Sequence, residues 1–220
     1  MPVPTFLAWC ATLLLPVVVA HLPLAHAQPA PPHTDAAEFR ACLQGLREAP
    51  AFRAVTPATF ATHTDGLVPD ASVLLLLDRQ PEFTLAPWDY LAVLVDAERV
   101  ADGRAAHARW QDTLAQIERQ TGVAAPIVVG VWGVESNFGQ NLGGRPLVQS
   151  LATLSCFGRR QGYFRGELAA ALRILQEGHV APQQFNGSWA GAFGQTQFMP
   201  STFLRSAVDF DGDGRCDIVG

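Results

Sequence analysis

The stretch of sequence that decides the fold is Pro126-Ile127-Val128-Val129-Gly130-Val131-Trp132-Gly133-Val134-Glu135-Ser136. Pro126 suits the first turn of an α-helix, and no ionisable side chain follows it before Glu135. Ser136, Asn137 and Gly139 then favour an end to the helix. The pattern therefore predicts an apolar helix whose last turn presents one carboxyl group to a cleft.

Glu135 is the only acidic residue between Glu118 and Glu167. A carboxyl at the end of an apolar helix loses hydration when charged, so we expect its pKa to be raised. A raised pKa suits a general acid near neutral pH. The alternative is a structural glutamate hydrogen-bonded to backbone or to an arginine, and the apolar neighbours favour the acid.

Glycosidases usually place a second carboxylate across the scissile bond. No other acid of this sequence stands in a comparably apolar setting. Glycan chemistry at Glu135 would therefore use a single acid and a nucleophile internal to the sugar, which points away from plain hydrolysis.

Glycines and aromatic residues become dense after Gly122. Apolar walls with a few polar groups are typical of grooves that bind sugars or peptides. A glycine-rich core with tight helix crossings would have the same composition, and composition alone leaves both interpretations open. Among these aromatic residues are Trp132, Phe138, Phe157, Tyr163, Phe164, Trp189, Phe193 and Phe198.

The composition is that of a packed domain, because 49% of the 220 residues are hydrophobic and 16% are charged. The fifteen basic residues are all arginine, and the net charge is −5. A net acidic chain with no basic run is a poor candidate for a dedicated nucleic-acid binder, since phosphate neutralisation supplies most of the affinity of that class. A polytopic membrane protein is also excluded, because one stretch alone approaches membrane length.

That stretch lies in residues 1–27 and ends at Ala25-His26-Ala27. It reads as a secretory signal peptide, with an uncleaved anchor as the alternative. Residues 28–34 are Pro-rich and read as a linker, and residues 35–220 read as one domain. We expect an exported, periplasmic protein, membrane-associated only if the signal stays uncleaved.

Helical periodicity dominates the next part of the chain. Thr34 or Asp35 can cap the first helix, and Gly122 is a C-terminal stop. The run 71–78 could also be a buried strand. The predicted helices are 35–48, 57–63, 71–78, 87–99 and, after an interruption at Gly103, 105–120.

An acidic loop occupies the end of the sequence, Asp209-Phe210-Asp211-Gly212-Asp213-Gly214-Arg215-Cys216-Asp217-Ile218. It has acids at positions 1, 3 and 5 of a calcium loop and the turn glycine at position 6. The Arg215 carbonyl would be the position 7 ligand, and Asp217 occupies position 9. Position 12 is Gly220, which lacks the closing carboxylate, so we expect weak calcium binding. The alternative is a solvated acidic turn.

Three cysteines remain after the predicted signal cleavage, and an exported chain meets an oxidising compartment. Three single pairings are possible, and three inert thiols are the alternative. We expect Cys42 to pair with Cys156, because a bridge to Cys216 would constrain the acidic loop. No Cys-x-x-Cys pair or Cys/His cluster suggests zinc.

These motifs, in their order and spacing, resemble the membrane-bound lytic murein transglycosylase B family, glycoside hydrolase family 103. The resemblance covers roughly residue 35 to the end. It is carried by Gly130-Val131-Trp132-Gly133-Val134-Glu135-Ser136-Asn137-Phe138-Gly139, Ser150-Leu151-Ala152-Thr153-Leu154, Arg159-Arg160, Gly187-Ser188-Trp189-Ala190-Gly191-Ala192-Phe193-Gly194-Gln195-Thr196-Gln197-Phe198-Met199-Pro200-Ser201 and the acidic loop, with Gln80-Pro81-Glu82-Phe83 and Tyr90-Leu91 also fitting.

The resemblance implies a mainly α fold: a lysozyme-like helical core, a helical accessory lobe and an EF-hand-like calcium loop. It implies a monomeric enzyme that acts on peptidoglycan strands, with structural Ca²⁺ and no catalytic cofactor. The β-1,4 bond between N-acetylmuramic acid and N-acetylglucosamine would be cleaved to a 1,6-anhydromuramoyl end. Glu135 would act first as acid and then as base.

The same resemblance implies glycan contacts for Ser188, Gln197 and Phe198, and a basic pair near the peptide stem at Arg159 and Arg160. The family continues beyond the calcium loop, so we expect the domain to be incomplete at its C-terminus. Two alternatives to the transglycosylase are a goose-type lysozyme that hydrolyses the same bond and a non-catalytic peptidoglycan-binding module.

Overall fold

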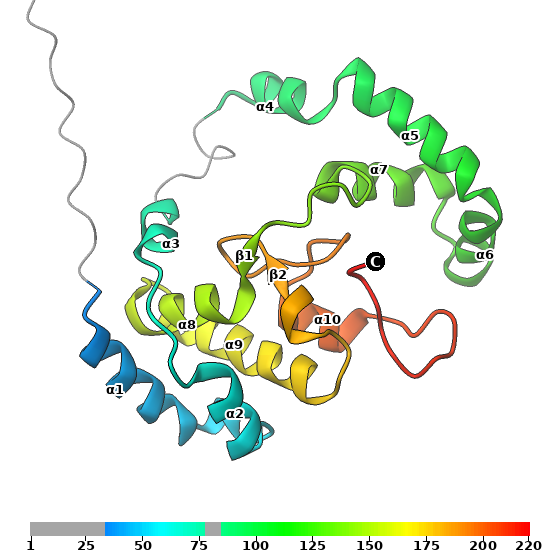
Figure 1. Cartoon of the computed structure of the whole chain (residues 1–220). Helices are drawn as coiled ribbons and strands as arrows, with labels where there is room; N and C mark the ends of the chain where they lie inside the picture. The colour runs from blue at the N-terminus through cyan, green and yellow to red at the C-terminus, as the bar shows by residue number, and fades with distance from the viewer. Residues whose placement is uncertain (1–33, 78–84) are drawn as a thin grey trace, which may run out of the picture. The chain divides into compact units, whose positions relative to one another are not determined.

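The computed structural model describes residues 34–77 and 85–220 (Figure 1). The chain divides into Met1–Ala30 and Pro31–Gly220, and the described residues belong to the second unit. The predicted signal peptide and the motif at 80–83 lie outside the described residues. Among the helices that the structure describes, none combines the length and the apolar character needed to cross a membrane.

The described residues are mainly helical, which confirms the predicted fold class. Two short strands, β1 (Arg145–Pro146) and β2 (Asn186–Gly187), pair antiparallel. The α-helices are α1 (Ala36–Arg47), α2 (Pro57–Thr64), α3 (Ala71–Leu76), α4 (Pro87–Leu94), α5 (Ala97–Arg109), α6 (Gln111–Thr121), α7 (Ala125–Ser136), α8 (Leu147–Phe157), α9 (Gln161–Gln176) and α10 (Pro200–Ser206), and the 3-10 helices are η1 (Pro50–Phe52) and η3 (Pro182–Gln184).

Helix ends follow the capping chemistry of the sequence. The Asp35 carboxylate accepts the backbone N–H groups of Ala37 and Glu38 at 2.8 Å each and so starts α1. Gly122 ends α6 with a φ of 75°. The run that could have been a strand is helix α3.

The predicted single helix over 87–99 is wrong, as is the break at Gly103. The Asp96 carboxylate caps α5 and separates it from α4, whereas Gly103 lies inside α5. A Cβ atom at residue 103 would lie 3.2 Å from Cζ of Phe138, so glycine here gives room to a ring. The break occurs instead at Trp110, between α5 and α6.

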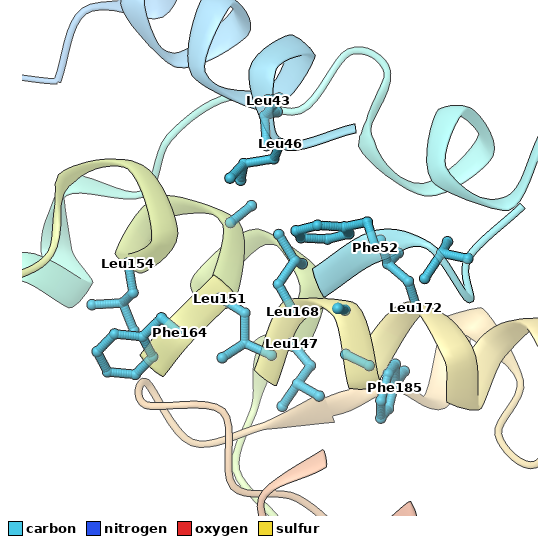
Figure 2. Close-up of a cluster of buried hydrophobic side chains, with 14 of the residues drawn as sticks. Leu43, Leu46, Phe52, Leu147, Leu151, Leu154, Phe164, Leu168, Leu172 and Phe185 are labelled. Carbon is cyan, nitrogen blue, oxygen red and sulfur yellow. The ribbon is translucent and has the colours of Figure 1, made fainter. Parts of the chain in front are cut away.

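Helices α8 and α9 run side by side and carry the centre of the hydrophobic core (Figure 1). Figure 2 shows Leu168 on the side of Phe52 in η1, whereas Leu147 and Leu151 point to the opposite side, toward β2 and the chain that follows it. Each fully buried side chain of this size contributes about 1.5–3 kcal/mol relative to exposure. The labelled residues are Leu43, Leu46, Phe52, Leu147, Leu151, Leu154, Phe164, Leu168, Leu172 and Phe185.

Cys42 of α1 and Cys156 of α8 form a disulfide, with their Cα atoms 5.9 Å apart. Cys216 is free. The bridge therefore joins the first described helix to the central one across a sequence separation of 114.

Asp70 connects α3 to β1. Its carboxylate accepts the backbone N–H of Ser72 at 2.9 Å and pairs with Nη1 of Arg145 at 2.7 Å. Partial burial alone would raise the pKa of Asp70, but the hydrogen bonds from Ser72 and the Arg145 guanidinium outweigh burial and lower it. The charged form is thus favoured in the folded state.

Asp70→Asn is expected to lower the free energy of unfolding by about 1 kcal/mol at neutral pH, since it weakens a cap and a half-exposed ion pair. A lowered folded pKa gives a contribution that is complete above the unfolded value of about 3.9 and is lost as pH falls through the folded pKa. Urea unfolding at several pH values measures the difference between wild type and variant. It should shrink below about pH 4, and a constant difference down to pH 2 would contradict the assignment. Asp65→Asn, at an exposed acid, is the control.

Candidate active site

Glu135 lies in the last turn of α7, and its side chain is exposed. Within residues 34–77 and 85–220 its carboxylate has no hydrogen bond or ion pair. The burial that the sequence predicts for the Glu135 carboxyl is therefore absent. The reason is helical geometry: Ile127, Val131 and Val134 share the exposed side of α7 with Glu135, so an apolar run here makes a surface stripe.

The chain turns sharply after Glu135. Asn137, Phe138 and Gly139 are consecutive residues with positive φ values of 50°, 57° and 83°. A left-handed conformation costs a non-glycine residue about 1–2 kcal/mol, so other contacts must hold the turn. The Ser136 hydroxyl supplies one, because it accepts the N–H of Gly139 at 3.0 Å.

The Phe138 ring supplies the second contact that holds this turn. It lies edge-on to the Trp132 ring, with centroids 5.7 Å apart, and it occupies the space above Gly133. A Cβ atom at residue 133 would lie 2.6 Å from Cζ of Phe138. The ring therefore packs directly on the α7 backbone next to Glu135.

Helix α7 is tied to the 188–199 loop, which connects β2 to α10. The indole Nε1–H of Trp132 donates to Oε1 of Gln195 at 2.9 Å. The structure thereby joins the helix of Glu135 to the loop that carries the predicted glycan-contacting residues. Gln195 is not among the predicted glycan-contacting residues, because nothing in the spacing distinguishes it from the nearby Gln197.

The predicted glycan-contacting residues shape the loop itself. The Ser188 hydroxyl accepts the N–H of Ala192 at 3.0 Å. Gln197 has a φ of 47°, and its Nε2 donates to two backbone carbonyls at 2.9 and 3.3 Å. Phe198 exchanges backbone hydrogen bonds with Phe193. The Gln197 Oε1 atom keeps its acceptor capacity within the described chain.

Arg159 and Arg160 precede α9 and line a cavity of about 280 Å³. The Arg160 guanidinium lies 4.4 Å from the Tyr163 ring centroid, a cation–π contact. Nη2 of Arg159 donates to the Leu77 carbonyl at 3.2 Å. The same cavity is lined by three residues of the 188–199 loop, so the basic pair and the loop share a surface. The other lining residues are Leu77, Phe164, Trp189, Ala190 and Met199.

The acidic loop brings carboxylate oxygens of Asp209, Asp211 and Asp213 within 4.8 Å of one another. The N–H of Gly214 donates to Asp209 and, with that of Gly212, lowers the pKa of Asp209, so this carboxyl is charged at neutral pH. Clustered hard oxygen ligands fit a calcium ion.

The other two predicted ligands differ in their contacts. Asp217 lies outside this cluster, and its Oδ1 instead accepts the N–H groups of Val219 and Gly220 at 2.8 and 3.3 Å. The Arg215 N–H donates to Asp213 at 2.8 Å, which keeps the position 7 backbone folded against the cluster.

Residues 38–220 match the model of the transglycosylase SLT domain. This chain belongs to that family. Over 157 residues the SLT chain is 36% identical to the membrane-bound lytic murein transglycosylase B of Escherichia coli (strain K12), covering 67% of this chain and 44% of that protein.

Solved structures of lytic transglycosylases are also similar to this chain. SltB3 from Pseudomonas aeruginosa in complex with NAG-NAM-pentapeptide is 42% identical, with a TM-score of 0.78, and the match covers 83% of this chain and 49% of SltB3. SltB3 has also been solved with NAG-anhNAM-pentapeptide, at a TM-score of 0.77. The Escherichia coli lytic transglycosylase SLT35 in complex with calcium is 29% identical, with a TM-score of 0.71, over 84% of this chain and 58% of SLT35. The SLT chain thus spans about half the length of these relatives.

Proposed function

We propose that this chain is a lytic transglycosylase that cleaves the β-1,4 bond between N-acetylmuramic acid and N-acetylglucosamine in peptidoglycan. Peptidoglycan lies outside the cytoplasm, so the chain would act in the periplasm. The observation that carries the proposal is the direct join between the helix of Glu135 and the loop of Ser188 and Gln197. The two SltB3 complexes support the substrate and the anhydro product by relationship.

Glu135 supplies the acid. A glycan on the apolar stripe of Ile127, Val131 and Val134 would exclude water from around the Glu135 carboxyl. The carboxyl gives its proton to the glycosidic oxygen as the bond to C1 of the muramic acid breaks. The Glu135 carboxylate then accepts the proton of the C6 hydroxyl, while the oxygen of that hydroxyl bonds to C1. One residue thus serves both steps, and no water is consumed.

Mass spectrometry of digested murein tests this reaction. We expect fragments with 1,6-anhydromuramoyl ends, each lighter by one water than a hydrolysis product. Hydrolytic ends alone would identify a lysozyme-type hydrolase, and binding without fragments would identify a non-catalytic module. Either result would overturn the proposal.

We also propose that Asp209, Asp211, Asp213 and the Arg215 carbonyl hold a structural calcium ion. The clustered carboxylates support it, as does the SLT35 complex with calcium by relationship. Bound calcium would offset most of the negative charge of the loop and order it, and the reaction at Glu135 takes no step through the ion.

Calcium is expected to raise the melting temperature, because a ligand that binds only the folded state stabilises it by mass action, about 2.7 kcal/mol at a hundredfold excess over Kd. Thermal melts across a calcium titration measure this effect. Asp211→Ala should abolish the response, and Asp112→Ala, at an exposed acid of α6, should keep it. A melting temperature that is independent of calcium up to millimolar levels would contradict the site.

A further inference from the structure

Gln195 lies where three segments of the chain meet. Its side-chain Oε1 accepts the indole N–H of Trp132 in α7 at 2.9 Å. Its backbone N–H donates to the carbonyl of Ile218, the last residue of the acidic loop, at 2.6 Å. Gln195 itself belongs to the 188–199 loop. One residue therefore links the helix of Glu135, the loop of the glycan contacts and the exit of the acidic loop.

The position of the Gln195 amide is closely restricted. Gly139, in the turn that follows Glu135, has a φ of 83°, and a Cβ atom there would lie 2.8 Å from Oε1 of Gln195. The amide therefore contacts α7 through the Trp132 indole and also lies against the turn at the helix end. A displaced Gln195 would release both contacts together.

The Trp132 ring is fixed from two sides. The Phe138 ring lies edge-on to it, at 84° and 5.7 Å between centroids, and the Gln195 amide binds its N–H. Trp132 lies one helical turn before Glu135, so the orientation of this ring sets where the last turn of α7 lies relative to the 188–199 loop.

We propose that Gln195 is a positioning residue for Glu135, acting through Trp132. The proposal rests on the proposed transglycosylase function. A single neutral hydrogen bond makes only a small net contribution to stability, so its loss should leave the fold intact. Misplacing a catalytic group by about 1 Å can cost a hundredfold in rate, so the same loss should act mainly on turnover.

The test compares kcat and KM of four variants with those of wild type, on soluble oligomers of NAG–NAM repeats. Gln195→Met keeps the side-chain length but has no acceptor for the indole, and we expect kcat to fall about tenfold or more with KM changed less than about twofold. Gln195→Glu keeps an acceptor oxygen and should restore most of kcat. Trp132→Phe and the double variant with Gln195→Met should each match Gln195→Met within about twofold, because the two residues act through one bond.

Gln176→Met is the matched control. Gln176 accepts the N–H of Thr56 at 2.7 Å and donates to the Ala54 carbonyl at 3.1 Å. Its substitution should lower the melting temperature and leave kcat unchanged, which separates loss of stability from loss of positioning. If Trp132→Phe does not fold, the contrast between Gln195→Met and Gln195→Glu still decides.

Two results would overturn the role of Gln195 while leaving the transglycosylase intact. One is a wild-type kcat in Gln195→Met, and the other is additive losses in the double variant. A wild-type chain that releases no fragments would instead overturn the proposed function, and the positioning role with it.

Discussion

Glu135→Gln is expected to abolish cleavage of murein while leaving the fold and glycan binding intact. Glutamine is nearly isosteric with glutamate but cannot deliver a proton, and general acid–base catalysis contributes about 10²–10⁴-fold in rate. The carboxylate has no protein partner within the described residues, so the substitution breaks no hydrogen bond there. Release of soluble anhydromuropeptides measures turnover, and a murein pull-down measures binding.

Glu98→Gln, at an exposed glutamate in the first turn of α5, is the matched control and should keep wild-type turnover. Circular dichroism should show the same helix content and melting temperature in both variants. Wild-type rates in Glu135→Gln would remove the acid from the proposed mechanism, because the sequence offers no substitute between Glu118 and Glu167.

Local chemistry predicted the ends of several of the described helices. Asp35, Pro57, Pro87 and Pro126 mark real helix starts, and Gly122 marks a real end. These signals act within one turn of the chain, so they can be read without knowing the fold.

Gly103 shows where such reading fails. A glycine inside a helical pattern suggests a break, but this one makes room for the Phe138 ring, 35 positions later in the sequence. The gain comes from a tertiary contact that no local rule contains. The Asp96 cap, in contrast, is a local signal that could have separated α4 from α5.

The candidate site, like the fold, could be predicted only in part. The motif placed Glu135 at the end of an apolar helix, as the structure does. It did not predict which side of that helix faces the core, because α7 is apolar on nearly every side and so carries little directional signal. The contact between Trp132 and Gln195 could not be predicted either, since it spans 63 positions in the sequence.

Removing the disulfide is expected to destabilise the protein strongly. The bridge closes a loop with a sequence separation of 114, and in the chain-entropy model a loop of that size stabilises by about 2–5 kcal/mol. It also holds α1 on α8, where Phe39 stacks on Phe157 with centroids 6.0 Å apart. For a domain of this size the double variant Cys42→Ala/Cys156→Ala should melt roughly 5–15 °C lower than wild type.

Thermal melts with and without reductant measure the contribution of the bridge. Reductant should lower the melting temperature of wild type and leave that of the double variant unchanged. Cys216→Ser is the control for the free thiol and should respond to reductant as wild type does, because Cys216 takes no part in the bridge. Peptide mapping without reduction should recover Cys42 and Cys156 in one linked pair. Two alkylated thiols at these positions, with equal melting of variant and wild type, would show that the bridge does not stabilise the fold.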